Sequence, residues 1–592
     1  MYKKTTQRAR LFTAGVLYAM ILALLSSCSP TPPEREDRDP EAATGLTNQE
    51  ETVSDQYMVS AANQYASESG SRILALGGNA IDAAVSVQMV LNLVEPQSSG
   101  IGGGAFLLYW DQSKKELVTF DGRETAPSSA DSTLFHGADG KPMKWIEAVV
   151  GGRSVGVPGV LKMFEKAHTQ YGNLPWATLF EDAIKLAEKG FVVSPRLEKL
   201  VAADINPGMK RAGNTRDYFF PKGQAIQAEQ TLTNPKLAEA LKMIAAQGTS
   251  AFYQGDIAKQ IIQAVNNDRD NPGQLSLQDL SNYEAQTRPP VCADYRGYKV
   301  CGMGPPSSGG LTVLQTLQIL SHFDLPNMEP LSTESIHIIS QAERLAFADR
   351  NTYIADIDFV AVPIDALLDP LYAAQRAKLI DTKRDMGAAI PGDMNTPISW
   401  VEAQSPELPS TSHYSIVDKQ GNGVSITTSI EMAFGSSLMV DGFLLNNQLT
   451  DFSFSSEKNG TEIANKVEPK KRPRSSMAPT MIFDKNGKLI ALIGSPGGSR
   501  IINYVTETIV ALLDWELSIQ DAINLPHFGN RNGATDLEKG TELEARKQDL
   551  EAMNHKVNIR DLNSGLHGIL IDSKSRLHGG ADPRREGAVI GR

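Results

Sequence analysis

The spacing of hydrophobic residues divides the chain into a mainly helical first part and a last part that is rich in strands. Apolar residues recur with a period of about 3.6 residues in six segments. The helices predicted in this way cover residues 59–76, 80–93, 176–189, 234–247, 256–267 and 501–512. From His413 the pattern becomes strand-like, and residues 414–418 and 423–430 flank a turn at 419–422, which is typical of a β-hairpin. A further strand is expected over Leu489–Gly494.

A glycine-rich segment, Gly100–Ala105, precedes a predicted strand at residues 106–110. Its glycines fit the dinucleotide-binding pattern G-x-G-x-x-A, but that motif follows a strand and opens a helix. Here a helix comes first and a strand follows. We therefore expect a tight loop that leads into a buried strand, and no nucleotide site.

The N-terminus is typical of a bacterial lipoprotein. Four basic residues occur among the first ten, and residues 11–25 are a mainly apolar run. That run is short for a membrane span of roughly 20 residues but fits a signal peptide. It ends in Leu-Ser-Ser-Cys, which resembles a lipobox, so we expect a signal peptide over residues 1–27 and a lipid on Cys28. A plain signal peptide that happens to end in cysteine is the alternative. Residues 28–53 are rich in Pro, Glu, Asp, Thr and Ser, which predicts a flexible tether.

Composition and charge exclude several classes of protein. With 592 residues, of which 41% are hydrophobic and 21% charged, the chain has an ordinary globular balance. Its net charge is −12, and removal of residues 1–27 with their four positive charges leaves −16. Such a chain has no electrostatic footprint for nucleic acid. The three cysteines and nine histidines do not cluster at metal-ligand spacing, so no metal and no other cofactor is expected.

Two of the cysteines lie in a second predicted hairpin, around Arg296-Gly297. If these two residues form the turn, the numbers of paired residues add up to 593, and Cys292 lies opposite Cys301. The pair is then non-hydrogen-bonded, with Cα atoms near 4.5 Å apart, at the short end of the disulfide range. An oxidising compartment favours the bond. Two free thiols remain the alternative, because one extra loop residue would break the register.

Candidate nucleophiles stand at the start of the first hairpin. A Ser-His-Asp triad built on Ser412 and His413 is disfavoured, because neighbouring residues of a strand point to opposite faces. The other possibility is an N-terminal threonine. If the hydroxyl of Thr411 attacked the carbonyl of Ser410, cleavage would release an α-amine, whose reference pKa near 8 suits a catalytic base.

From Thr411 onward the sequence resembles the γ-glutamyltranspeptidases. The signature comprises Thr411–Ile416, Gly421-Asn422, Val424-Ser425, Thr427, Ile430-Glu431 and Phe434-Gly435. Further matches are 122–127, 157–159, 305–310, 343–350, 444–448, 471–477, 494–500 and 581–584. These enzymes are N-terminal-nucleophile hydrolases. The resemblance therefore implies an α+β, four-layer αββα sandwich, built jointly by a large subunit (54–410) and a small catalytic subunit (411–592) from one precursor.

The resemblance also implies roles for the catalytic residues. Thr411 would be the nucleophile, and the Ser410–Thr411 bond the site of autoprocessing. Ser429 would hold the hydroxyl of Thr411. The backbone N–H groups of Gly497 and Gly498 would stabilise the oxyanion, which suits glycine because the backbone must approach the reacting carbon closely.

Six further residues are expected to bind the γ-glutamyl group. Those expected to bind its α-carboxylate are Arg123, Ser475 and Ser476. Those expected to bind its α-ammonium are Glu431, Gln448 and Asp451. A guanidinium can donate two hydrogen bonds to a carboxylate, and an ammonium requires amide or carboxylate oxygens.

The implied activity is that of a γ-glutamyltransferase or glutathione hydrolase. Such an enzyme cleaves γ-glutamyl amide bonds, in glutathione and related compounds, through a γ-glutamyl-Thr411 acyl-enzyme, and passes the acyl group to water or to an amino acid or peptide. The expected location is the bacterial cell envelope, with the lipid as the membrane contact. A glutaryl or cephalosporin acylase on the same fold is the first alternative, and an inactive lipid-anchored binding protein is the second.

Three departures from the family pattern affect these expectations. Position 429 is Ser where Thr is common, and position 431 is Glu where the best-known members have Asn. The segment Phe454–Lys470, which stands in the place of the family's lid, contains no Tyr and looks short. We therefore expect a more open site, with consequences for the choice between water and other acceptors.

Overall fold

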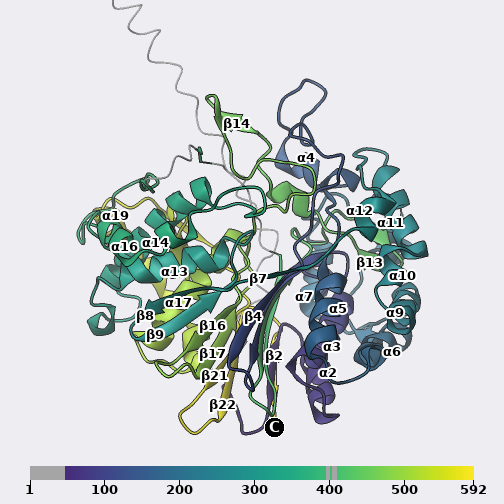
Figure 1. Cartoon of the computed structure of the whole chain (residues 1–592), viewed down its shortest axis with the longest axis horizontal. Helices are drawn as coiled ribbons and strands as arrows, with labels where there is room; N and C mark the ends of the chain where they lie inside the picture. The colour runs from purple at the N-terminus through teal and green to yellow at the C-terminus, as the bar shows by residue number, and fades with distance from the viewer. Residues whose placement is uncertain (1–46, 212, 395–399, 403–409) are drawn as a thin grey trace, which may run out of the picture. The chain divides into compact units, whose positions relative to one another are not determined.

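The computed structural model describes residues 47–211, 213–394, 400–402 and 410–592. Within them, two seven-stranded sheets pack face to face, and helices cover both outer faces (Figure 1). This is the four-layer αββα arrangement that the sequence predicted. The predicted signal peptide, Cys28 and the first part of the predicted tether lie outside the described residues.

Both parts of the chain, before and after Thr411, contribute strands to both sheets. The first sheet has the order β1 (Thr52–Ser54), β22 (Leu577–Ala581), β21 (His567–Ile571), β17 (Leu489–Gly494), β16 (Thr480–Phe483), β9 (Tyr298–Gly302) and β8 (Val291–Tyr295). The second has the order β23 (Ala588–Gly591), β2 (Met58–Ala61), β10 (Ser412–Val417), β11 (Gly423–Ser429), β3 (Gly104–Asp111), β4 (Glu116–Asp121) and β7 (Gln286–Arg288). Cleavage before Thr411 would therefore leave two interleaved pieces.

One helical layer packs against the second sheet around a shared apolar core. Its helices are α2 (Gln64–Ala75), α3 (Ala80–Val94), α5 (Val160–Tyr171), α6 (Glu181–Lys189), α7 (Pro195–Ala202), α9 (Pro235–Gln247), α10 (Ser250–Tyr253) and α11 (Asp256–Asn266). The other layer packs against the first sheet. Its helices are α13 (Gly309–Leu320), α14 (Thr333–Tyr353), α16 (Pro370–Ala377), α17 (Ile501–Leu513), α18 (Ile519–Asn524) and α19 (Lys547–Ala552).

Shorter elements complete the fold. The helices among them are α4 (Trp145–Val149), α8 (Asn214–Phe219), α12 (Leu277–Ser281) and α15 (Ile364–Leu367). The small sheets are β5 (Phe191–Val192) with β6 (Thr231–Leu232), β12 (Met439–Val440) with β13 (Phe443–Leu444), β14 (Glu457–Lys458) with β15 (Thr461–Glu462), and β18 (Phe528–Asn530), β19 (Thr535–Glu538) and β20 (Val557–Arg560).

Strand β3 shows how the sequence builds two cores at once. Its side chains alternate between the two faces of the sheet. Those in the core beneath the helices are Ala105, Leu107 and Tyr109. Those in the core that includes the space between the sheets are Phe106, Leu108 and Trp110. A strand buried on both faces is apolar throughout, which explains the continuous hydrophobic run in the sequence.

Most predicted elements are confirmed to within a few residues, but the first predicted helix began too early. Residues 58–61 form strand β2, and helix α2 starts only after Asn63, whose side chain accepts a hydrogen bond from the Tyr65 N–H. Pairing of β2 with β10 and β23 overrides the helical spacing here. The tether prediction extended too far for a similar reason, because Thr52–Ser54 pair with β22 as strand β1.

The Gly100–Ala105 segment is, as predicted, a loop that leads from helix α3 into strand β3. A Cβ atom at Gly102 would lie 2.1 Å from the carbonyl oxygen of Leu444, so the backbones approach too closely for a side chain. The glycines therefore serve packing.

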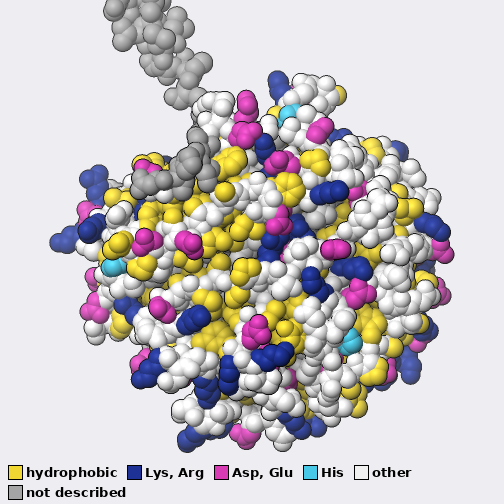
Figure 2. Space-filling view, viewed as in Figure 1, with side chains coloured by type: hydrophobic (Ala, Val, Ile, Leu, Met, Phe, Trp, Pro, Cys, Tyr) yellow, Lys and Arg dark blue, Asp and Glu magenta, His cyan; other side chains and the backbone are white. Residues whose placement is uncertain are grey.

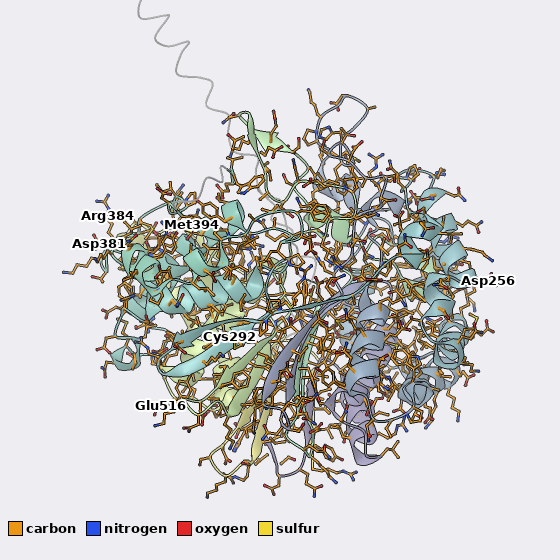
Figure 3. All side chains as sticks on the ribbon, in the orientation of Figure 1. Asp256, Cys292, Asp381, Arg384, Met394 and Glu516 are labelled. Atoms are coloured by element: carbon orange, nitrogen blue, oxygen red, sulfur yellow. A yellow bond between two sulfur atoms is a disulfide. The ribbon has the colours of Figure 1, made fainter. Side chains whose placement is uncertain are left out.

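The second predicted hairpin is confirmed together with its disulfide. In β8–β9, Cys292 pairs with Cys301 in the predicted register, their Cα atoms lie 4.1 Å apart, and the two sulfurs are bonded. Arg296 and Gly297 both have positive φ, 53° and 84°, as a tight two-residue turn requires. Figure 3 shows Cys292 on the outer strand of the first sheet.

The surface offers no large field of a single sign on the face seen in Figure 2, where acidic and basic side chains are interspersed. Within the described part of the chain, no helix combines the length and the apolar character that a membrane span needs.

Candidate active site

A small cavity brings together ten of the eleven residues that the sequence assigned to catalysis, processing and substrate binding. They are Arg123, Ser410, Thr411, Ser429, Glu431, Gln448, Asp451, Ser475, Ser476 and Gly498, with Met477 and Ile501 completing the lining. Gly497 is next to Gly498 in the chain. These residues come from segments on both sides of the predicted processing site.

Two hydroxyl groups converge on the carbonyl oxygen of Ser410, the residue before the predicted nucleophile. Thr411 Oγ1 donates to this oxygen at 2.5 Å, and Ser429 Oγ donates to it at 2.8 Å. The two hydroxyl oxygens are 3.2 Å apart. The Ser410 hydroxyl donates to the carbonyl of Gln97 at 2.6 Å, which fixes the residue before the bond. The carbonyl is thus held beside the Thr411 hydroxyl and polarised by Ser429.

The hairpin β10–β11 places these groups. Strand β10 begins at Ser412, directly after Thr411, and strand β11 ends at Ser429, so the two hydroxyls meet at the same end of the hairpin. The backbone N–H of Glu431 donates to Ser429 Oγ at 2.8 Å. This contact leaves the Ser429 hydroxyl hydrogen directed at the Ser410 carbonyl.

Ser412 and His413 point to opposite faces, as the sequence argument required. The Ser412 hydroxyl donates to Glu95 at 3.1 Å, whereas His413 Nδ1 lies 2.9 Å from the hydroxyl of Thr427. Burial, reinforced by His567, lowers the pKa of His413 well below its ordinary value, so the ring is neutral. The two side chains do not form a catalytic pair.

Arg123 lines the cavity and is almost fully buried. Its guanidinium donates to the carbonyls of Pro473 and Arg474, each at 3.1 Å, and forms an ion pair with Asp451. It also lies 3.5 Å from Glu124, the neighbour that a purely structural interpretation would pair with it. The structure therefore pairs Arg123, which was predicted to bind the α-carboxylate of the γ-glutamyl group, with Asp451, which was predicted to bind its α-ammonium.

Glu124, although not predicted as a site residue, belongs to the same buried charge group. Burial raises the pKa of its carboxyl group to about 8, against the opposing effect of Arg123. At neutral pH the Glu124 carboxyl group is therefore largely protonated. It does not neutralise the charge of Arg123, which acts on Asp451 and on the cavity.

Acceptor oxygens line the side of the cavity assigned to the ammonium group. Asn447 donates a hydrogen bond to the carboxylate of Glu431, whose φ of 79° is unusual for a residue other than glycine. Gln448 Oε1 is buried and has no hydrogen-bond partner among the described residues. An amide oxygen in that state, in a cavity that Glu431 and Asp451 also line, is a site for an N–H donor from a ligand.

The predicted oxyanion glycines form a turn between strand β17 and helix α17. Gly497 and Gly498 have positive φ values of 136° and 57°, and a Cβ atom at Gly497 would lie 2.7 Å from the ring of Tyr504. Only glycine fits this turn. The strand–turn–helix arrangement is as predicted, and it places backbone N–H groups near a helix N-terminus, which favours an anion.

Comparison with known proteins now decides the family. The model of the gamma-glutamyltranspeptidase family matches residues 66–592. The chain belongs to this family. It is 36% identical to the glutathione hydrolase proenzyme of Bacillus subtilis (strain 168), over 98% of each chain. It is also 36% identical to the glutathione hydrolase proenzyme of Escherichia coli (strain K12), over 89% of this chain and 90% of that one.

A solved structure confirms the fold. Cephalosporin acylase from Bacillus halodurans superposes with a TM-score of 0.82 at 28% identity, covering 94% of this chain and 99% of that one. The predicted γ-glutamyltranspeptidase family, N-terminal-nucleophile hydrolase fold and enzymatic class are thus confirmed.

Two segments that match the γ-glutamyltranspeptidases, 305–310 and 343–350, make contacts with Ser475 and Ser476. Arg350 donates to Ser476 Oγ at 2.6 Å and to Ser308 Oγ at 2.8 Å. Ser308 in turn donates through its hydroxyl to the carbonyl of Ser475 at 2.7 Å. The segments 305–310 and 343–350 therefore position the two serines. Their resemblance to the family was the available signal, but nothing in the sequence pointed to the contacts with Ser475 and Ser476.

The segment in the place of the γ-glutamyltranspeptidase lid is a small hairpin. Within Phe454–Lys470, strands β14 and β15 pair over two residues each. The ring of Phe454 stacks on Phe135 with the ring centroids 4.3 Å apart, and neither ring is among the residues that line the cavity. The only aromatic side chain of this segment is thus used to anchor its base.

Proposed function

We propose that this protein cleaves itself before Thr411 and then hydrolyses or transfers γ-glutamyl groups through that threonine. The observation that carries the proposal is the convergence of the Thr411 and Ser429 hydroxyls on the Ser410 carbonyl, inside a cavity lined by Arg123 and acidic side chains. The Thr411 hydroxyl can perform both reactions. Before cleavage it faces the Ser410–Thr411 peptide bond, and after cleavage it faces the cavity in which a substrate would bind.

The processing step is an N→O acyl shift. Thr411 Oγ attacks the Ser410 carbonyl carbon, the C–N bond breaks, and an ester forms between Ser410 and the threonine oxygen. The hydrogen bond from Ser429 stabilises the charge that develops on the carbonyl oxygen, and the nitrogen that leaves takes the proton of the threonine hydroxyl. Water hydrolyses the ester, which leaves a carboxylate on Ser410 and a free α-amine on Thr411.

The acyl-transfer step uses the same atoms. The α-amine accepts the proton of Thr411 Oγ as this oxygen attacks the γ-carbonyl of the substrate. The N–H groups of Gly497 and Gly498 stabilise the oxyanion, and the leaving amine takes the proton. Water or an amine acceptor then releases the γ-glutamyl group from Thr411.

Charge at the cavity favours a γ-glutamyl group over a glutaryl group. The α-carboxylate would meet Arg123, Ser475 and Ser476, while Glu431, Gln448 and Asp451 would surround the α-ammonium. A glutaryl chain lacks the ammonium and would leave this acidic side unpaired. Because the fold is similar to that of a cephalosporin acylase, acylase activity is the second candidate function.

One experiment separates these readings. The purified protein is given a γ-glutamyl anilide and a glutaryl anilide, each with and without a dipeptide acceptor. We expect turnover of the γ-glutamyl compound alone, and the ratio with and without acceptor measures transfer against hydrolysis. Faster turnover of the glutaryl compound would favour the acylase, and turnover of neither would favour a binding protein.

The subunit division and the location are part of the proposal. A denaturing gel should show a large piece that ends at Ser410 and a small piece of 182 residues, Thr411–Arg592. We further propose that the protein is exported and anchored through a lipid on Cys28. Cys28→Ala should then release soluble protein or block removal of the signal peptide. Detergent-dependent membrane association of a cleaved Cys28→Ala protein would contradict the anchor.

A further inference from the structure

Arg585 contacts the predicted nucleophile from the far end of the chain. It is 1% exposed and lies just before strand β23. Its guanidinium donates to the carbonyl oxygen of Thr411 at 3.0 Å and to that of Ser564 at 2.8 Å. No pattern in the sequence pointed to this residue, since its partners in these bonds are backbone carbonyl groups.

The surroundings of Arg585 are built to admit it. A Cβ atom at Gly565 would lie 2.7 Å from Arg585 Cδ and 2.6 Å from Pro496 Cγ. The Gly565 N–H donates to Ser495 Oγ at 3.3 Å. Gly565 thus packs against both Arg585 and Pro496, the residue before the oxyanion glycines, and the guanidinium of Arg585 joins the backbone of Ser564 to that of Thr411.

The charge of Arg585 acts on the base that cleavage creates. Backbone bond lengths place the nitrogen of Thr411 within about 4 Å of its own carbonyl oxygen, and therefore within about 7 Å of the guanidinium. Arginine keeps its charge at all accessible pH values. A fixed positive charge at this range disfavours protonation of an amine. The same effect contributes at His567, whose pKa burial lowers to about 4 with a further lowering by Arg585.

Other charged groups surround Thr411 and act in both directions. The acidic groups are Glu95 behind strand β10, and Glu431 and Asp451 in the cavity. The basic groups are Arg123 in the cavity and Arg196, 3.8 Å from Glu95. His413, two residues after Thr411, is neutral. Asp451 is paired with Arg123 and Glu95 with Arg196, whereas Arg585 is bonded directly to the threonine.

We propose that Arg585 is a positioning residue that holds Thr411 through its carbonyl and keeps the amine released by cleavage in its uncharged, basic form at neutral pH. This inference rests on the proposed function, in which that amine is the base. It assigns to the protein a second arginine with a role opposite to that of Arg123, one that contacts the nucleophile and not the substrate.

The test compares the processed wild type with R585Q, which removes the charge, and R585K, which keeps it. The dependence of kcat/KM on pH is measured with a γ-glutamyl anilide. We expect the acid limb of R585Q to move up by about one pH unit, and that of R585K to stay within a few tenths of a unit. R576Q, an exposed arginine of the same subunit, is the matched control and should not move.

The outcomes are separable. A lower kcat in R585Q with an unmoved acid limb means a structural role only and overturns the proposal. If R585Q is not cleaved, the wild type decides: the pH dependence of cyanate labelling of the small-subunit N-terminus should have its midpoint about one unit below the reference value near 8. A midpoint at 8 or above overturns the proposal. A wild type that is not cleaved at all refutes the proposed function instead.

Discussion

Two β-hairpins of similar design differ in how far they depend on the rest of the molecule. The hairpin β8–β9 lies at the edge of the first sheet, and its disulfide joins two of its own residues, while Arg296 in its turn forms an ion pair with Asp514 at the end of helix α17. The hairpin β10–β11 lies in the middle of the second sheet, between strands β2 and β3. We call them the edge hairpin and the nucleophile hairpin. The register and the disulfide of the edge hairpin depend on its own residues, whereas the chemistry of the nucleophile hairpin depends on residues from elsewhere in the chain.

Contacts at the nucleophile show this dependence. The groups around Thr411 and Ser410 come from Gln97, Ser429 and Arg585, which are separated by up to 488 positions. In the edge hairpin, Cys292 and Cys301 are nine positions apart. Local sequence can therefore set the register of either hairpin, but the chemistry of the nucleophile hairpin arises only in the folded chain.

The largest effect should come from removing the nucleophile itself. Thr411→Ala should give a single uncut chain without activity, because one hydroxyl performs both the cleavage and the acyl transfer. A denaturing gel and an assay with a γ-glutamyl anilide measure the two losses. Thr428→Ala, in the same hairpin, is the control that should still be cleaved, since its hydroxyl contacts the carbonyl of Gly104 instead. Normal cleavage of Thr411→Ala would place the nucleophile elsewhere.

The next largest effect should come from Arg123, which is distant in sequence from the nucleophile hairpin and lines the same cavity. Arg123→Lys should raise KM for γ-glutamyl substrates by about 10- to 150-fold, which corresponds to about 1.5–3 kcal/mol for a charged hydrogen bond. A lysine keeps the charge but cannot make the two-pronged contact. Initial rates over a range of substrate concentrations measure it, and Arg269→Lys at an exposed site is the control. An unchanged KM would remove Arg123 from the substrate site.

The same contrast explains how much the sequence could predict. Register arithmetic found the Cys292–Cys301 bond, because a hairpin is governed by its own residues. Periodicity located most helices and strands but extended a helix back over Val59, where pairing with β10 decides the structure. A single short segment does not show whether its apolar residues meet a sheet or a helix.

Site residues required a different source of information. No local pattern distinguishes Arg123 or Asp451 from an ordinary surface charge, and their roles were predicted only because the surrounding motifs resemble a family. Arg350 and Arg585 were missed, although both are buried within the polar network. Their partners are serine hydroxyls and backbone carbonyls far away in sequence, and such pairs leave no charge pattern along the chain.

A smaller effect is expected in the edge hairpin. Replacing both Cys292 and Cys301 by Ser should lower the free energy of unfolding by at most about 2.5 kcal/mol, since the bond closes a short loop. Cleavage before Thr411 and KM should not change, because the bond lies outside the site. Thiol titration of the denatured, unreduced protein checks the bond itself, and two reactive thiols from this pair would contradict it. Slower cleavage in the double variant would show that the edge hairpin is not an independent unit.

The smallest effect concerns protons and belongs to the nucleophile hairpin. Because burial holds the pKa of His413 well below its ordinary value, the folded state keeps this ring neutral while the unfolded chain protonates it below about pH 6.5. Its contribution to stability is therefore complete above that pH and is lost as the pH falls. Wild type should exceed His413→Gln in unfolding free energy at pH 7.5, and the excess should shrink by about 1 kcal/mol between pH 6.5 and 5.5. Urea unfolding of both proteins at these pH values measures the difference, in which the titration of all shared groups cancels. A constant difference would mean that His413 takes up its proton as readily in the folded state as in the unfolded chain, and that the core behind the nucleophile is more polar than its hydrogen bond to Thr427 indicates.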